Sequence, residues 1–90
     1  MISANEAKEM VNQYYANKEE EWKQVAVNKL EIISRDIERN AQIGMSSLRI
    51  NERVIFFKEL RIEEIVVEEL KRLGYKVDTS NGHLIVRWGN

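Results

Sequence analysis

The C-terminal end of the chain limits the fold most, because its turn residues and its side-chain alternation agree on one strand register. Asn81-Gly82 is a strong hairpin signal, since a two-residue type I′ turn needs positive φ at both central residues. Pairing outward from this turn sets Thr79 opposite Leu84, Val77 opposite Val86 and Tyr75 opposite Trp88, so that the apolar residues of both strands share one face. A slip of one residue would mix the two faces. We therefore predict a C-terminal β-hairpin in this register.

The first half of the chain is helical by local criteria, because it lacks proline and is rich in Ala, Glu, Lys, Gln and Leu. Ser3-Ala4-Asn5-Glu6 is a capping box, so we expect a helix to begin at Ala4. Apolar residues then recur at helical spacing up to Gly44, which is well suited to end a helix. This apolar stripe is interrupted between Asn17 and Glu21.

Two interpretations of the interruption stay open. Asn17 and Glu20 could cap a second helix, which would give two helices at an angle. Alternatively, one helix of about 38 residues continues over roughly 57 Å at 1.5 Å per residue. A compact globule of this size is only about 30 Å across. A continuous helix would therefore project from the globule and would need a partner to cover Tyr14, Tyr15 and Trp22.

After Gly44 the pattern changes to short elements. Residues 45–50 alternate weakly and predict a short strand with Leu48 and Ile50 on one face. Residues 52–58 fit either a helix or a buried strand, and Asn51 is expected to cap this segment. We expect a helix from about residue 59 until Gly74, where the hairpin begins directly.

These elements predict a fold of the α+β class in a single domain, residues 1–90. The N-terminal half, residues 4–43, consists of one or two helices and is expected to serve oligomerisation. The C-terminal half, residues 45–90, has the order β-α-β-β and forms a small antiparallel sheet that ends in the hairpin.

Composition narrows the classes of function. The chain has no cysteine and one histidine, so it lacks a thiolate metal site and the histidine pair of many zinc sites. It also lacks a nucleophile elbow, a phosphate-binding loop and a dinucleotide fingerprint. We therefore expect no enzyme activity, no metal and no cofactor. The 14 basic and 15 acidic residues nearly balance, which argues against nucleic acid as a partner.

The sequence shows no sign of a membrane protein. Its first residues lack the basic and apolar regions of a signal peptide, and no apolar run approaches the roughly 18 residues that a membrane-spanning helix needs. We expect a soluble protein of a reducing cytoplasm that does not associate with membranes.

Two groups of side chains are candidate binding residues. The first lies near the interruption of the helical stripe and comprises Tyr14, Tyr15, Trp22 and Val25. Aromatic side chains dominate protein interfaces, so we predict that this group forms an intermolecular surface. The second group lies on the polar face of the hairpin and comprises Lys76, His83 and Arg87. Together these side chains could hold a phosphate-bearing ligand.

Leu73-Gly74-Tyr75-Lys76-Val77, followed by a hairpin that closes on Val86-Arg87-Trp88, resembles the C-terminal end of small proteins encoded by tailed bacteriophages and prophages. In that group a helical half precedes a strand, a helix and such a hairpin. The resemblance implies a phage or prophage origin and an accessory protein in the cytoplasm of the bacterial host. The matched residues are structural, so the resemblance implies no catalytic or binding residue.

The sequence supports two hypotheses about function. The leading one is a non-enzymatic interaction protein that forms a homo-oligomer through its helical half and binds or inhibits a host protein. The alternative is a protein that binds or sequesters a small ligand such as a phosphorylated nucleotide.

Overall fold

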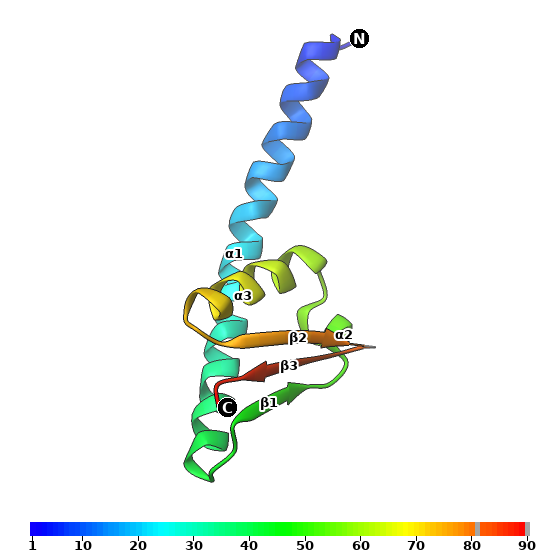
Figure 1. Cartoon of the computed structure of the whole chain (residues 1–90). Helices are drawn as coiled ribbons and strands as arrows, with labels where there is room; N and C mark the ends of the chain where they lie inside the picture. The colour runs from blue at the N-terminus through cyan, green and yellow to red at the C-terminus, as the bar shows by residue number, and fades with distance from the viewer. Residues whose placement is uncertain (81, 90) are drawn as a thin grey trace.

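The structure is a computed structural model that describes residues 1–80 and 82–89. It confirms the α+β class, with a long N-terminal helix followed by a small antiparallel sheet (Figure 1). The elements come in the order α1 (Ala4–Gln42), β1 (Ser47–Ile50), α2 (Arg53–Phe57), α3 (Leu60–Arg72), β2 (Lys76–Ser80) and β3 (His83–Arg87).

The N-terminal half is one continuous helix, so the interpretation with a break near Asn17 is wrong. Helix α1 begins at Ala4 as predicted, where the hydroxyl of Ser3 accepts a hydrogen bond of 3.2 Å from the amide of Glu6. The Lys and Glu residues that interrupt the apolar stripe are themselves good helix formers. Lys18 and Glu21 also form an ion pair of 3.3 Å along the helix. The helix therefore continues through a segment that has lost its apolar stripe.

Both long helices end as the glycines predicted. Gly44 has φ +84°, and its amide donates to the carbonyl of Ala41 while the amide of Met45 donates to that of Asn40. These two bonds are the pair that defines a Schellman motif, in which a residue of positive φ follows the helix. Helix α3 ends in the same way at Gly74, which has φ +98°.

Residues 52–58, which the sequence left open, contain the short helix α2. Asn51 does not cap this helix, and that prediction is wrong: the N-cap is Glu52, which has φ +51° and makes no side-chain capping bond. The amide of Arg53 instead donates to the carbonyl of Gly82 in the hairpin, at 2.8 Å. A tertiary contact therefore fixes the start of α2. Lys58 then forms a tight turn of positive φ that leads into α3.

The sheet has the strand order β1-β3-β2, and all pairs are antiparallel. The predicted hairpin register is confirmed, since Val77 pairs with Val86 and Thr79 with Leu84. The turn was predicted at Asn81-Gly82, and Asn81 lies outside the described residues. Strand β1 adds to the other side of β3, where it aligns its apolar residues with those of the hairpin. One face of the sheet is therefore apolar across all three strands.

The hydrophobic core lies between this apolar face and the helices. Helix α1 packs against β1 and α3, and α3 packs against β2. The buried apolar residues are Ala26, Ile33, Ile37, Ile50, Phe57, Ile62, Val66, Leu70, Leu84 and Val86. The three from α1 all come from its C-terminal half. The N-terminal half of α1 therefore adds nothing to the buried core.

The molecule is elongated because α1 extends beyond this core. Its extents are 62 × 23 × 19 Å, and its radius of gyration is 16.9 Å, against about 12 Å for a compact domain of this length. Figure 1 shows the N-terminal part of α1 standing clear of the sheet and of α3. We call residues 4–17 the arm and the rest of the chain the body. At 1.5 Å per residue the arm is about 21 Å long.

Candidate interaction surface

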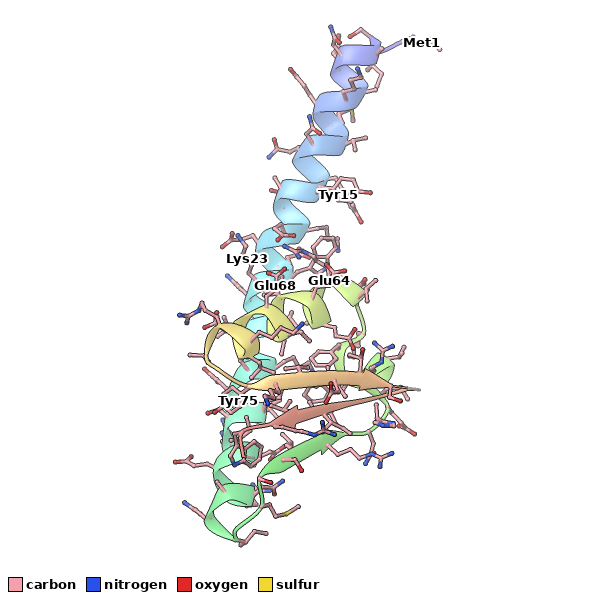
Figure 2. All side chains as sticks on the ribbon, in the orientation of Figure 1. Met1, Tyr15, Lys23, Glu64, Glu68 and Tyr75 are labelled. Atoms are coloured by element: carbon pink, nitrogen blue, oxygen red, sulfur yellow. The ribbon has the colours of Figure 1, made fainter. Side chains whose placement is uncertain are left out.

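The arm presents apolar side chains that no other part of the chain covers. Met10, Val11, Tyr14 and Tyr15 are 63, 52, 55 and 58 % exposed. Within the described part of the chain, the arm makes no hydrogen bond or ion pair with another element. In Figure 2 the side chain of Tyr15 projects from α1 beyond the level at which α3 meets it.

The structure divides the predicted interface group. Tyr14 and Tyr15 lie exposed on the arm, and Val25 lies on the body with 36 % of its area exposed. Trp22 is half-buried and packs against the hydrophobic core, so much of its surface is already used within the chain. The structure therefore leaves Tyr14, Tyr15 and Val25 available to another molecule, and Trp22 only in part.

Sequence reasoning missed Ile32, an apolar residue on the outer face of α1 that is 40 % exposed. Val11, Val25 and Ile32 are separated by multiples of seven residues, which places them along one line of a slightly supercoiled helix. The buried residues of α1 lie on a different line, a quarter turn away. The seven-residue spacing is visible in the sequence and was the signal that could have found Ile32.

A charged pair holds the base of the arm to the body. Two nitrogens of the Arg61 guanidinium, Nη2 and Nε, donate to the carboxylate of Glu19, and the bond from Nη2 is 2.6 Å long. The third nitrogen, Nη1, donates to Glu64 at 3.3 Å. The hydrogen bond from Arg61 lowers the pKa of Glu19, and the same bond raises the pKa of Arg61. This pair joins α1 to the start of α3, so it fixes the point at which the arm leaves the body.

The predicted anion-binding residues do not all converge. Lys76 and Arg87 lie opposite each other on the outer face of the sheet, and Arg87 binds Asp78 at 2.6 Å. His83 shares that face, but it lies four residues from Arg87 on β3, which is roughly 13 Å along a strand. His83 and Arg87 therefore lie at opposite ends of β3, and Arg87 is already paired with Asp78.

His83 instead lies beside Arg49 of β1, with 3.4 Å between Nδ1 of the ring and Nη2 of the guanidinium. Among the described residues no carboxylate forms an ion pair with Arg49. The two side chains border an open hollow of about 420 Å³, whose other lining residues are Asn51, Glu52, Val54, Ile55 and Gly82. Sequence reasoning missed Arg49 because the pairing of β1 with β3 is not a local feature.

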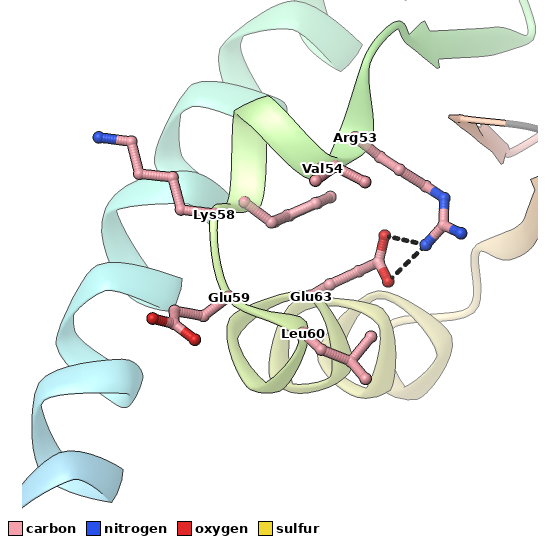
Figure 3. A pocket seen from close by; sticks show the side chains of 7 residues that line it. Arg53, Val54, Lys58, Glu59, Leu60 and Glu63 are labelled. Atoms are coloured by element: carbon pink, nitrogen blue, oxygen red, sulfur yellow. Dashed lines mark hydrogen bonds and ion pairs between the residues drawn. The ribbon is translucent and has the colours of Figure 1, made fainter.

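A more deeply buried ion pair lies beneath α2 (Figure 3). Nη1 of Arg53 donates to both carboxylate oxygens of Glu63 at 2.8 Å, and Glu63 is only 7 % exposed. The pair borders a small cavity of about 110 Å³, next to the side chains of Val54 and Leu60. Because both oxygens of Glu63 accept hydrogen bonds from Arg53, this carboxylate is suited to holding α2 against α3 rather than to proton transfer.

Two kinds of feature are absent from residues 1–80 and 82–89. That part of the chain holds no group of three or more His, Cys, Asp or Glu side chains that could bind a metal ion. None of its helices combines the length and the apolar character needed to cross a membrane. Comparison of the chain with protein-family models, with curated proteins and with solved structures gives no match.

Proposed function

We propose that this chain is a non-enzymatic interaction protein that associates with further copies of itself through α1. The observation that carries the proposal is the arm, whose large apolar side chains are all more than half exposed. Burying a side chain of this kind is worth up to about 1.5–3 kcal/mol. Contact with another chain would bury several of them at once.

The spacing of the exposed residues supports a second helix as the binding partner. Apolar residues seven apart form the seam of two-stranded coiled coils, and Val11, Val25 and Ile32 keep that spacing from the arm onto the body. A second copy of α1 is a helix of the same length that could lie along these residues. Self-association through α1 would therefore bury Val11, Val25 and Ile32 together.

Light scattering after size-exclusion chromatography tests self-association. We expect the wild-type mass to exceed the 10.6 kDa of one chain at high concentration and to approach it on dilution. Tyr14→Glu should remain monomeric, because it places a charge where an apolar contact is needed. Ala16→Glu, on the opposite face of the same turn, is the matched control and should behave as the wild type does. A wild-type chain that stays monomeric at about 100 µM would refute the proposal.

The proposal includes a second partner, a host protein of the bacterial cytoplasm that this chain binds or inhibits. Its support is the resemblance of the C-terminal hairpin to phage and prophage proteins. Affinity capture from a bacterial lysate tests it, with Ala16→Glu as bait beside the wild type. We expect both baits to retain the same host protein. Recovery of only the bait itself would count against a host partner.

A second candidate function, the binding of a phosphorylated small ligand, is favoured by the hollow beside Arg49 and His83. When Arg49 donates to Nδ1, the neutral ring carries its proton on Nε2 and offers it to a ligand. Lys76 lies on the same face of the sheet but at the other end from the hollow, and Arg87 opposite it is paired with Asp78. A phosphate group in the hollow would thus meet two donors, Arg49 and His83.

Thermal-shift measurements with nucleoside mono- and diphosphates test this candidate. A ligand at 100 times its Kd should add about 2.7 kcal/mol to the free energy of unfolding. Arg49→Ala should abolish the shift, whereas Arg35→Ala, which removes an exposed arginine of α1, should leave it unchanged. Equal behaviour of these two variants, or no shift with any nucleotide, would exclude the site.

A further inference from the structure

We propose that α1 pairs with α1 of a second copy in an antiparallel orientation, with Lys18 of each helix opposite Glu21 of the other. This inference rests on the self-association proposed above and adds the alignment of the two helices. Its basis is the exposed face of α1, the charges on that face and the absence of cover over the arm.

One exposed face of α1 is formed by two parallel lines of residues, each with seven-residue spacing. The first line is Ala4, Val11, Lys18, Val25 and Ile32, and the second is Ala7, Tyr14, Glu21, Asn28 and Arg35. Such lines, three and four residues apart, are the two that form the seam of a coiled coil. All ten residues are exposed or half-buried, and none belongs to the buried core. A second helix can therefore lie on this face without displacing the core.

The charges on these lines decide the orientation. Lys18 and Glu21 already form an ion pair of 3.3 Å within each helix. In a parallel pair in register, Lys18 would lie opposite Lys18 of the second copy and Glu21 opposite Glu21, so each layer would bring like charges together and add no new ion pair. In an antiparallel pair, each residue of the first line faces a residue of the second line. Lys18 then meets Glu21 of the second copy at the centre, and the two-fold symmetry forms this contact twice.

Once Lys18 faces Glu21, the remaining layers are fixed. Tyr14 faces Val25 of the second copy, and Ala7 faces Ile32. Val11 faces Asn28, and Ala4 faces Arg35 at the ends of the overlap. The small side chain of Ala7 borders a shallow hollow next to Val11, which leaves room for a larger residue from another chain. The helices overlap from residue 4 to residue 35, about 47 Å at 1.5 Å per residue. This alignment covers Val11 and Tyr14 of the arm and Val25 and Ile32 of the body in one interface, whereas Met10 and Tyr15 lie outside the two lines.

A second antiparallel alignment, in which Tyr14 faces Val11, is less favourable. It pairs only the two arms and leaves Val25 and Ile32 in water, where they are now 36 and 40 % exposed. It also sets Lys18 opposite Ala7 and Glu21 opposite Ala4, so neither charge gains a partner. The exposed residues and the charges therefore both favour the alignment in which Lys18 faces Glu21.

Cysteine cross-linking tests the orientation, because the native chain has no cysteine. The double variant Ala7→Cys/Ile32→Cys should form a disulfide-linked dimer under mild oxidation, since each thiol meets the other type across the interface. The single variants Ala7→Cys and Ile32→Cys should remain unlinked under the same conditions. Ala16→Cys, on the opposite face of α1, is a further control and should not cross-link.

The outcomes separate this inference from the proposed function. If each single variant cross-links to itself, the helices are parallel and the antiparallel inference is overturned, although self-association stands. If the double variant fails to cross-link while light scattering shows a dimer, the alignment is likewise overturned. If the wild type and every variant are monomeric, self-association itself fails, and the alignment fails with it.

Discussion

Glu19 is the residue at which α1 becomes fixed to the rest of the molecule. Its carboxylate accepts three hydrogen bonds from Arg61 of α3. On its N-terminal side the arm has no such contact within the described part of the chain, and on its C-terminal side Trp22 already packs on the core. Along α1 from the N-terminus, this ion pair is therefore the first that joins the helix to another element among the described residues.

We expect Glu19→Gln to lower the melting temperature in a pH-dependent manner. Arg61 lowers the pKa of Glu19 in the folded chain below its ordinary value of 4.5. The stabilisation of the folded chain by the Glu19–Arg61 pair is therefore complete above pH 4.5, and it is lost as the pH falls through the lower pKa that Glu19 has in the folded chain. The difference in melting temperature between wild type and variant should be largest near neutral pH and should vanish in acid. Glu20→Gln, next to it, should show no such trend, and a difference that is constant with pH would contradict the argument.

A second residue-scale prediction concerns Leu84, which is fully buried at the centre of the sheet. Leu84→Ala should lower the free energy of unfolding by about 2–5 kcal/mol, because it removes buried methyl groups and leaves a cavity. Leu60→Ala is the matched control, since Leu60 is 67 % exposed, and should change stability by no more than about 0.5 kcal/mol. Urea denaturation measures both values, and similar losses would show that the core is not where the structure places it.

At the scale of elements, the features that sequence reasoning predicted are those determined locally. The cap at Ser3, the stops at Gly44 and Gly74 and the hairpin register each depend on a few neighbouring residues. The pairing of β1 with β3, and with it the contact between Arg49 and His83, depends on residues 34 positions apart. Helix α2 was left open for the same reason, because its first amide is held by the hairpin.

The helix stop at Gly74 can be tested by substitution. Gly74 has φ +98°, and a Cβ added there would meet no other atom within 4 Å. The cost of Gly74→Ala should therefore come from the backbone conformation alone and amount to about 1–2 kcal/mol of unfolding free energy. Gly74→Asn should cost less, because asparagine tolerates positive φ better. Urea denaturation measures both, and a larger loss for Asn than for Ala would contradict this account.

At the scale of the whole molecule, the chain combines a small packed body with a helix that extends well beyond it. A helical segment shorter than about 12–15 residues is only marginally stable in water without packing. The arm continues a helix that the body already nucleates, so it forms without a separate nucleation step. Its stability in a single chain nevertheless depends on propensity and on the Ser3 cap, because the packing that stabilises the body is missing there.

Amide hydrogen exchange should therefore report self-association through the arm. In dilute solution we expect the amides of residues 4–17 to exchange rapidly, since unpacked helix ends open at almost no free-energy cost. At about 100-fold higher concentration the same amides should become protected, because a second copy of α1 covers them. The amides of β3 lie at the centre of the sheet and should be equally protected at both concentrations.

Tyr14→Glu should abolish the concentration dependence in the arm alone. Protection of the arm that is strong and independent of concentration would mean that the arm is stable by itself, and the argument that it needs a second copy would fail.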